Sequence, residues 1–552
     1  MIIRFACLFL FLAISALTDQ RAVRADVRPN ILFILTDDQG WPSLESYGGD
    51  LVPTPNLERL AADGMRLTDA YVMPQCTPTR AALLTGQHTA KNQMWHVIGW
   101  YGTPRAPIAE PMYRLNLQPQ QCRLPRWLQQ NGYRTGMGGK WHLTNNQHGY
   151  YTILRQKSGP LFGFDHVAPP GKGSQNDGDK WVDHLTDDAC DFIRRNRDRP
   201  WFYYLSHHTL HGKVSAPRPL IDKYSQSGAP KVGMHNATYL AAIEHLDNSV
   251  GRLLKTLDET RTADNTLVVF LADNGGVDTQ YNLPAWSDDP LDGSRPLSIK
   301  EQQYENAPLR EGKGSAYEGG IRVPCIVRWP GVIDRGRVET TPVHIVDWLP
   351  TLCSAAGCPT KTDEDGEDLT PLFRSKTTSE AISNRSLYWY LPLYDLRWAA
   401  TPCAVIRRGP WKLIHYFGDS FDKTHQYRIG ERSELFNLQE DIGESTDLSL
   451  AKPALTAELR SELVQWIQRC SAVVPESNSH NDPEQRLAET REVPAWKLPV
   501  HVHPQNAHWF QYGGETIALI TSAEHYGAVI NRDFDYRTYL KTLADDGMNY
   551  TR

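Results

Sequence analysis

The sequence has 552 residues, of which 40% are hydrophobic and 22% are charged, and its formal net charge is −6. These values are ordinary for a globular protein with a large apolar core. Nucleic-acid-binding proteins usually carry a basic face, so we expect no nucleic acid among the partners of this acidic chain. An anionic substrate stays compatible, because a single pocket can be positive inside an acidic protein.

The N-terminus, residues 1–25, has the pattern of an export signal. Arg4 supplies a positive charge, Phe5 to Ile14 is an apolar run, and small residues precede a cleavage site after Ala25. The alternative is a membrane anchor, but a spanning helix needs ~20 apolar residues. We therefore expect a secreted or periplasmic protein with no membrane association after removal of the signal.

Three apolar runs in the first half of the chain predict strands that are buried on both faces of a parallel sheet. Ile31–Leu35 is followed by Asp37 and Asp38, and Thr266–Leu271 is followed by Asp273 and Asn274. The third run, from Trp201 to Leu205, ends in Ser206-His207-His208.

Helical patterns lie between these runs. They cover Pro55 to Gly64, Pro125 to Gly132 and Tyr239 to Leu257. Strands that alternate with helices indicate an α/β fold with a mostly parallel sheet flanked by helices, which we assign to residues 26–383. Ligands in such folds bind beyond the carboxyl ends of the strands, where the polar residues after each run would meet.

The pattern changes at about residue 384. Ala404–Ile414 and Ser433–Leu438 read as short antiparallel strands, and Pro453–Arg469 reads as a helix. We interpret residues 384–474 as a smaller C-terminal antiparallel sheet with a covering helix.

The last part of the chain is divided into a linker and a tail. Residues 475–508 are polar and contain prolines, as in a linker. Residues 509–552 resemble the opening of a (β/α)₈ glycoside-hydrolase-like domain, with a strand, a loop, a helix and the start of a second strand. A complete barrel needs ~250 residues, so we interpret the tail as a remnant or truncated fusion.

Four of the polar residues at the strand ends are oxygen donors, namely Asp37, Asp38, Asp273 and Asn274. Oxygen donors without sulfur or imidazole in the same blocks favour Ca²⁺ or Mg²⁺ over zinc. The alternative is that each pair caps a helix or lies in a solvated turn.

The segment Gln75 to Arg80, QCTPTR, combines a cysteine, a proline and an arginine at the predicted start of a helix that ends at Gly86. The unpaired N–H groups of a helix N-terminus favour an anion near Cys76. Arg80 lies four residues on and can face the same anion as an oxyanion donor. The alternative is a chance cysteine before a helix.

Basic residues follow in several places. In an extended segment Lys140 and His142 point to the same side and offer a cation and a proton donor. His207, His208 and His211 follow the third strand, and Lys313 precedes a glycine-rich turn. Taken alone, Lys140 and His142 are better explained as an exposed basic pair, the histidines are ambiguous, and Lys313 gives no signal.

Taken together, these residues resemble a known family. Cys76-Thr77-Pro78-Thr79-Arg80, ending at Gly86, is similar to the signature of type I (formylglycine-dependent) sulfatases. The blocks LTDDQG, GGKWH, ADNGG and EGGIRVP are similar to further blocks of that family, in the same order, between Arg28 and Cys470. The resemblance implies an arylsulfatase-like member of the alkaline phosphatase superfamily, with that fold and a small C-terminal antiparallel subdomain.

The resemblance implies that a separate formylglycine-generating enzyme oxidises Cys76 to formylglycine. One hydroxyl of the hydrated aldehyde then attacks sulfur, and the second lets the sulfate leave without another attack at sulfur. The implied ligands of the divalent cation are Asp37, Asp38, Asp273, Asn274 and the modified Cys76. Ca²⁺ is the usual ion and Mg²⁺ is the alternative.

The resemblance also implies roles for the basic residues. Lys140 and Lys313 bind the sulfate oxygens, and Arg80 holds the nucleophile together with the cation. His142 is the partner of the formylglycine hydroxyl, and His211 protonates the leaving alcohol or binds sulfate. Leu210 stands where the family often has proline, which leaves His208 as a rival of His211.

The expected function is the hydrolysis of sulfate monoesters, with a sulfated carbohydrate as the substrate. One alternative is a phosphomonoester or phosphonate-ester hydrolase on the same scaffold, and another is a non-catalytic protein that binds sulfated glycans. Tyr388-Trp389-Tyr390 with Tyr394 offers a sugar-stacking wall, or else packs in the core. The pairing of the cysteines stays undecided at this point.

Overall fold

The computed structural model describes residues 28–98, 106–145, 153–172, 178–282, 298–359, 363–374, 380–421 and 427–478, with three short strands between 501 and 517. The signal expected at residues 1–25 lies outside the described residues. The described residues as far as Ser477 belong to one compact unit, and those from Asn478 on belong to another.

Eight strands among the described residues form the largest sheet, which is the mixed, mostly parallel sheet that the sequence predicts. Only β11 runs antiparallel to both of its neighbours. In spatial order the strands are β12 (Arg337–Glu339), β2 (Met65–Leu67), β11 (Cys325–Arg328), β8 (Thr266–Ala272), β1 (Asn30–Thr36), β7 (Trp201–Ser206), β5 (Arg134–Gly139) and β6 (His166–Val167).

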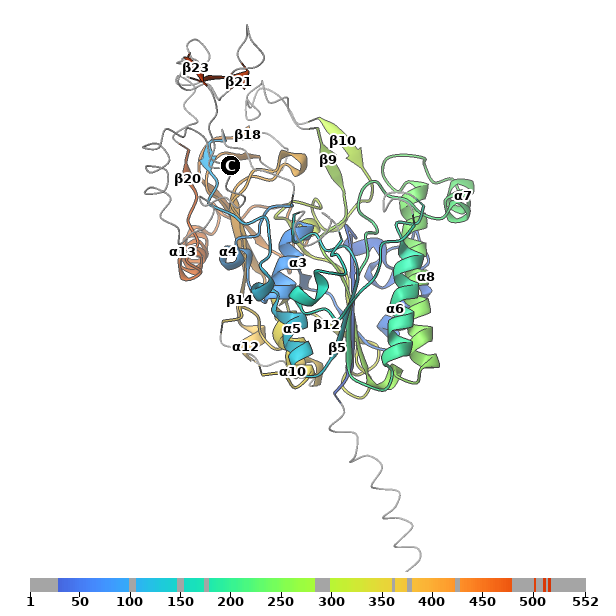
Figure 1. Cartoon of the computed structure of the whole chain (residues 1–552). Helices are drawn as coiled ribbons and strands as arrows, with labels where there is room; N and C mark the ends of the chain where they lie inside the picture. Colours follow the sequence, from blue (N-terminus) through green and yellow to red (C-terminus); the bar gives the residue numbers. More distant parts are fainter. Residues whose placement is uncertain are drawn as a thin grey trace, which may run out of the picture. The chain divides into compact units, whose positions relative to one another are not determined.

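Helices cover both faces of this sheet (Figure 1). Ile31, Phe33 and Leu35 of β1 pack with the helices of one face, which are α3 (Cys76–Thr85), α5 (Arg123–Gln130) and α10 (Trp348–Ala355). Leu32 and Ile34 pack with the opposite helices, which are α2 (Pro55–Ala62), α6 (Val182–Asn196) and α8 (Ala237–Glu259). An unbroken apolar run is needed in β1 because both of its faces are buried.

The helix boundaries follow local chemistry. The Asn236 side chain accepts a hydrogen bond from the Tyr239 N–H at 3.0 Å and so caps the start of α8. Helix α5 begins at Arg123, two residues before the proline that the sequence pattern suggested as its start. Proline is tolerated there because a helix makes no use of the N–H groups of its first turn.

The predicted C-terminal sheet is present and antiparallel. Its strands are β14 (Ser386–Leu391), β15 (Cys403–Arg408), β16 (Trp411–Tyr416) and β19 (Arg432–Asn437), and α13 (Pro453–Arg469) covers it. Leu459, Leu463 and Ile467 of α13 pack against Ile406 and Leu413 of the sheet.

A buried ionic contact joins the C-terminal sheet to the short helix α9 (Glu318–Ile321). The Lys412 ammonium of β16 lies 2.9 Å from Glu318 and 2.7 Å from Glu444, and all three side chains are fully buried. The second carboxylate oxygen of Glu444 accepts the backbone N–H of Glu318. Glu318 begins α9, directly after the loop that carries Lys313.

Short elements complete the described chain. The paired strands are β3 (Ala70–Tyr71) with β13 (Val343–His344), β4 (Ile108–Ala109) with β20 (Glu476–Ser477), β9 (Thr279–Tyr281) with β10 (Ile299–Gln302), and β17 (Ser420–Phe421) with β18 (Tyr427–Arg428). The short helices besides α9 are α4 (Thr89–Asn92), α7 (Arg218–Gln226), α11 (Thr370–Arg374) and α12 (Glu380–Ser383).

The C-terminal segment differs from expectation where it is described. The predicted linker, residues 475–508, begins with β20, whose backbone pairs with β4, and it also contains β21 (His501–Val502). In the tail, β22 (Phe510–Tyr512) and β23 (Glu515–Ile517) extend β21 into an antiparallel sheet, whereas barrel strands are parallel. The predicted helix and second strand of the tail, after residue 517, lie outside the described residues.

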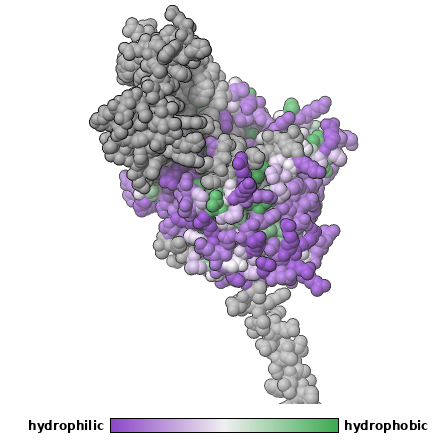
Figure 2. Space-filling model, viewed as in Figure 1, coloured by the Kyte–Doolittle hydropathy of each residue, from purple (hydrophilic) through white to green (hydrophobic). Residues whose placement is uncertain are grey.

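The described surface seen in Figure 2 is mainly hydrophilic, with small separate hydrophobic patches. None of the helices in the described ranges combines the length and the apolar character that crossing a bilayer requires.

Candidate active site

Three neighbouring strands end at the same edge of the main sheet. In the parallel pairing of β1 with β8, Thr36 lies opposite Ala272, and in the pairing of β1 with β7, Leu35 lies opposite Ser206. The residues that follow each strand therefore leave the sheet side by side. This brings Asp37, Asp38, Asp273, Asn274 and the histidines after β7 together, as the alternation of strands and helices predicted.

The three carboxylates form a buried cluster of oxygen donors. Oxygens of Asp37, Asp38 and Asp273 lie within 4.8 Å of one another, and none of these residues is more than 1% exposed. The Asn274 amide N–H donates to Asp38 Oδ1 at 2.8 Å, and the backbone N–H of Asp38 donates to Asp273 Oδ1 at 3.3 Å.

Two oxygens of this cluster, Asp37 Oδ1 and Asn274 Oδ1, are buried and accept no hydrogen bond from any described residue. Buried acceptors are rarely left unpaired in proteins. An all-oxygen set of three carboxylates and one amide suits a hard cation such as Ca²⁺ or Mg²⁺. The four residues therefore fit the divalent cation that the sequence predicts.

Burial and neighbouring charges shift the pKa values of the three carboxyl groups in different directions. Burial raises the pKa of Asp273 to about 6 and also raises that of Asp38. For Asp37, burial acts in the same direction, but the cations Lys140 and Arg80 hold its pKa well below the usual range. Asp37 is thus the carboxylate of the cluster that is most firmly ionised.

Cys76 is the first residue of α3 and lies beside this cluster. Gln75 is extended and Gly86 ends the helix with a φ of +68°, so the predicted helix is confirmed and starts at the cysteine itself. The Cys76 sulfur lies within 4.8 Å of both an Asp37 oxygen and a His211 nitrogen. Cys76 is fully buried, and burial raises the pKa of its thiol to about 12.

Arg80 has a different environment from the one expected of an oxyanion donor. Its Nε and Nη2 donate to Asp273 Oδ2 at 3.1 and 2.7 Å, and Nη2 also lies 3.3 Å from Asp37. Its Nη1 donates to the Lys140 carbonyl and to Ser206 Oγ. A fully buried guanidinium with these partners orients two carboxylates rather than facing a ligand.

The two predicted lysines each pair with one carboxylate. Lys140 Nζ lies 2.5 Å from Asp37, and Lys313 Nζ lies 2.7 Å from Asp38. Burial opposes the charge of each ammonium, but the carboxylates outweigh burial and raise both pKa values. Both lysines are therefore charged, and both line the same cavity.

His142 reaches this cavity by a different route from the one predicted. Its φ is +53°, so the chain does not continue as the regular extended segment that would place Lys140 and His142 on one side. Both nevertheless line the cavity. The His142 carbonyl accepts the Thr77 hydroxyl at 2.9 Å, which ties this turn to the signature helix.

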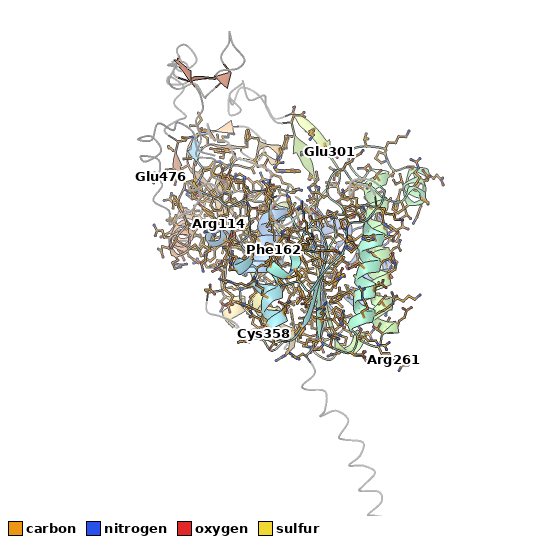
Figure 3. The ribbon with its side chains drawn as sticks, in the orientation of Figure 1. Arg114, Phe162, Arg261, Glu301, Cys358 and Glu476 are labelled. Atoms are coloured by element: carbon orange, nitrogen blue, oxygen red, sulfur yellow. The ribbon has the colours of Figure 1, made fainter. Side chains whose placement is uncertain are left out.

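The cavity has a volume of about 550 Å³. Its walls come from the strand-end loops, the β9–β10 hairpin and the loop before β15, and Figure 3 labels Glu301 of this hairpin. The lining side chains are Asp38, Val97, Lys140, His142, Lys180, His208, His211, Lys213, Val277, Gln280, Lys300, Glu301, Gln303, Lys313, Arg397 and Trp398.

Of the three histidines after β7, two line the cavity. His208 is 4% exposed, and burial holds its pKa and that of His211 well below the usual range, so both rings are neutral. His207 lies instead against Ser249 of α8, with its Nε2 3.3 Å from the hydroxyl. The structure thus keeps both His208 and His211 as candidates.

Sequence reasoning missed several of the lining residues. Lys180, Lys213, Lys300, Arg397 and Trp398 are scattered over more than 200 residues, in no motif, and only the fold brings them together.

Of the two alternatives for the aromatic residues near 390, a sugar-stacking wall or core packing, the structure supports core packing. Trp389, Tyr390 and Tyr394 are at most 1% exposed, and Tyr388 stacks on Trp466 with ring centroids 4.7 Å apart. These rings are core because they lie between the antiparallel sheet and its neighbours. Trp398 is the aromatic side chain that lines the cavity.

Comparison with known proteins agrees with this geometry. A family model described as Sulfatase matches residues 29–358. The chain belongs to the sulfatase family. Sulfatases are sulfuric ester hydrolases, so the protein is an enzyme of that class, and the resemblance seen in the sequence blocks is confirmed. A second model, for the C-terminal part of N-sulphoglucosamine sulphohydrolase, matches residues 312–471.

Named relatives and solved structures are also similar to this sulfatase. A sulfatase of Formosa agariphila is 29% identical over 85% of this chain and 94% of that protein. The N-acetylgalactosamine-6-sulfatase of Canis lupus familiaris is 31% identical over 67% of this chain and 70% of that protein.

Two solved structures show the same fold. Ps i-CgsB in complex with k-i-k-neocarrahexaose matches with a TM-score of 0.61 at 23% identity, over 84% of this chain and 97% of that chain. A phosphonate monoester hydrolase from Silicibacter pomeroyi matches with a TM-score of 0.58 at 18% identity, over 82% of this chain and all of that chain. The expected alkaline-phosphatase-like α/β fold is confirmed.

Proposed function

We propose that this sulfatase releases sulfate from a sulfated carbohydrate, with a formylglycine made from Cys76 and a divalent cation, Ca²⁺ or Mg²⁺. The observation that supports this most is the meeting of Cys76, Asp37 and His211 within 4.8 Å at the edge of a cavity lined by Lys140 and Lys313. The cation would be held by Asp37, Asp38, Asp273, Asn274 and the modified Cys76.

The cation and the formylglycine supply, when present, an activated oxygen nucleophile and a positive centre for the sulfate oxygens. The chain's own residues do the rest. Lys140 and Lys313 bind sulfate oxygens, because their ammonium groups are buried, charged and directed into the cavity. Arg80 fixes Asp37 and Asp273 in the positions that the cation needs.

Proton transfer is assigned to the two histidines nearest the nucleophile. His142 holds or removes a proton at the hydroxyl formed from Cys76. His211 gives a proton to the oxygen of the leaving alcohol, with His208 as its rival. The exclusion of water from these rings keeps them neutral at rest, so that each can accept a proton before it donates one.

A carbohydrate is the proposed substrate class because the cavity is large and polar. Its 550 Å³ accommodates a sugar unit, and Gln280, Gln303 and Trp398 offer hydrogen bonds and one aromatic face. The relatives include a sulfatase named for N-acetylgalactosamine and a structure bound to neocarrahexaose. We further propose that the protein is exported and that a separate maturation enzyme modifies Cys76.

The test is sulfate release from a panel of defined sulfated saccharides by the matured protein, with the Cys76→Ala variant as the blank. A phosphate ester of the same alcohol serves as the rival substrate, since the fold is shared with a phosphonate monoester hydrolase. A larger kcat/KM for the phosphate ester would refute the sulfatase assignment of this site. Mass spectrometry of the Cys76 peptide checks the formylglycine, and an unmodified thiol in active protein would refute it.

A further inference from the structure

Lys180 lies in the wall of the active-site cavity and forms no ion pair with a carboxylate in the described part of the chain. Among the described residues four lysines are buried, and three of them pair with carboxylates: Lys140 with Asp37, Lys313 with Asp38, and Lys412 with Glu318 and Glu444. Lys180 is only 1% exposed, and it forms no ion pair with any described residue.

The Lys180 ammonium has one hydrogen bond within the described part of the chain, which it donates to the Lys213 carbonyl at 3.0 Å. An ammonium has three N–H donors, so two have no acceptor among the described residues and are available to a ligand in the cavity. Burial lowers the pKa of Lys180 to about 8, against the opposite effect of Asp37. Lys180 is therefore still charged at neutral pH, and its burial without an anion is costly.

The backbone at Lys180 has an unusual conformation, and the neighbouring Trp181 side chain holds it in place. Lys180 and Trp181 both have left-handed conformations, with φ of +55° and +62°, which non-glycine residues adopt at a cost. The Trp181 ring packs edge-on to His208 at 5.9 Å, and its Nε1 donates to the Lys172 carbonyl. A Cβ at Gly171 would lie 2.6 Å from the same ring, so glycine is needed there.

Lys180 lines the same cavity as His208 and His211. In addition to burial, which has the largest effect, Lys180 lowers the pKa of both rings, although Lys140 lowers each of them more strongly. His208 Nε2 is a further buried atom without a hydrogen bond among the described residues. Lys180 and His208 therefore both offer hydrogen-bonding groups to a ligand in this cavity.

We propose that Lys180 and His208 form a subsite for a second anionic group, a sulfate or a carboxylate, on the sugar that carries the scissile sulfate. This inference rests on the proposed function and narrows its substrate class to doubly anionic saccharides. The pairing of charges supports it: Arg80, Lys140 and Lys313 each contact a carboxylate of the strand-end cluster, whereas Lys180 contacts no carboxylate among the described residues.

The experiment compares Lys180→Met and Lys180→Arg with the wild type on a hexose monosulfate, the corresponding hexose disulfates and a hexuronate sulfate. A lost charge-assisted hydrogen bond corresponds to a loss of about 10- to 100-fold. We expect Lys180→Met to lower kcat/KM for the doubly anionic sugars by that factor more than for the monosulfate, mainly through KM. Lys180→Arg should restore part of the lost kcat/KM. If the second anion is a sulfate, the hexose disulfates lose the most, and if it is a carboxylate, the hexuronate sulfate loses the most.

The matched control is Lys172→Met, which removes an exposed lysine of the same loop that does not line the cavity. Equal losses for monosulfate and doubly anionic sugars in Lys180→Met would overturn the proposal. A binding measurement keeps it separate from catalysis: in a Cys76→Ala background, calorimetry with a hexose disulfate should show the same loss of affinity. If the wild type released no sulfate, the proposed function would fail, and this binding result would still decide the subsite.

A second inference concerns Cys353 and Cys358, which lie at the end of α10. The Cys358 N–H donates to the Cys353 carbonyl at 2.8 Å, the Gly357 N–H donates to Ser354 at 3.0 Å, and Gly357 has a φ of +68°. This pair of bonds is the helix-ending motif in which the side chains of the first and last of these residues touch. The contact of the two thiols raises the pKa of Cys353 and lowers that of Cys358.

We propose that Cys353 and Cys358 form a disulfide when the protein meets a small-molecule or protein disulfide as oxidant. The Cys358 thiolate attacks one sulfur of that disulfide and releases one thiolate. Cys353 then attacks Cys358 Sγ in the mixed disulfide and releases the second, and the two cysteine protons pass to the two released thiolates. Cys358 lies at the opposite end of the unit from Glu301 (Figure 3), so the bond would act on stability and not on the active site.

The test incubates folded protein with oxidised glutathione, alkylates the remaining thiols and analyses the tryptic peptide of residues 338–361, which contains both cysteines. We expect this peptide to be two hydrogens lighter and not alkylated, and the Tm to rise by about 1–3 °C. Cys358→Ser should abolish the shift, whereas Cys470→Ser should keep it. Alkylation of both cysteines after oxidation would overturn the proposal.

Discussion

Replacement of Lys412 by methionine tests how the C-terminal sheet is held to the α/β unit. Methionine keeps most of the volume of the side chain and removes the charge that faces Glu318 and Glu444. Glu318 keeps Arg322 as a partner at 3.3 Å, but the Glu444 carboxylate keeps, among the described residues, only the backbone N–H of Glu318. The variant therefore leaves a carboxylate buried without a cation.

The magnitude follows from burial. Breaking a buried ion pair by removing one partner costs about 3–5 kcal/mol, which is a large part of the ~5–15 kcal/mol that stabilises a typical protein. Burial raises the pKa of Glu444 even with Lys412 present, and loss of the lysine raises it further. A carboxyl whose folded-state pKa exceeds its unfolded value of 4.5 takes up a proton on folding.

The pH dependence therefore has a definite sign. Burial of Glu444 does not lower the free energy of unfolding at a pH below the unfolded pKa of the group. The free energy of unfolding falls as pH rises from that value to the folded-state pKa. The slope approaches ~1.4 kcal/mol per pH unit. Wild-type Glu444 bears the same cost up to its own folded-state pKa of about 7, so we expect the stability deficit of Lys412→Met to grow between pH ~7 and pH ~9, where the variant still holds the proton that the wild type has lost.

Urea unfolding followed by tryptophan fluorescence at the two pH values measures this deficit. The control is Lys223→Met, whose half-exposed lysine lies 2.6 Å from Glu244 and should contribute less than ~1 kcal/mol. Adding Glu444→Gln to Lys412→Met should recover part of the loss at the higher pH. A deficit equal to that of the control, or one independent of pH, would refute the reasoning.

Three further outcomes are expected. Chelation of divalent cations should abolish sulfate release and lower Tm, because Asp37, Asp38 and Asp273 then repel one another. Re-addition of Ca²⁺ or of Mg²⁺ should show which ion restores both activity and Tm. Full activity and an unchanged Tm in chelator would contradict the cation site. Gly139→Ala should destabilise the folded protein by more than ~2 kcal/mol, because its Cβ would lie 1.9 Å from the Ser206 carbonyl oxygen at a φ of +98°. Gly228→Ala, with open space around its Cβ, should cost less stability. Equal losses of stability would argue against the clash. Trp398→Ala should lower kcat/KM for a saccharide sulfate by about 10-fold, whereas Tyr388→Ala, outside the cavity, should lower only stability; the reverse result would restore the aromatic wall near residue 390.

The sequence predicted the parts of the site that lie in contiguous blocks. Asp37 and Asp38 directly follow β1, and Asp273 and Asn274 directly follow β8, so a buried apolar run with polar residues at its end was enough to place them at one edge. The α3 helix was equally readable, because Cys76 and Gly86 mark its two ends. In each case one short segment contains both the residues that form the strand or helix and the side chains of the site.

The sequence could not assign partners to charged side chains. Arg80 was expected to face an anion, but the fold places Asp273 and Asp37 against its guanidinium. The aromatic residues near 390 were equally compatible with a binding wall, and only packing against α13 and the main unit shows that they are core. Residue type gives a side chain's capacity for contacts, whereas tertiary structure selects which contact it makes.

By itself, then, the sequence determined the fold class, the strand-end cluster and the presence of the sulfatase signature, because these depend on periodicity and on residues adjacent in the chain. Only the tertiary structure decided that Lys180 lines the same cavity as His208 and contacts no carboxylate among the described residues. The physical reason is that burial and charge pairing depend on neighbours in space, and the Lys213 carbonyl that Lys180 contacts lies 33 residues further along the chain, in no motif with it.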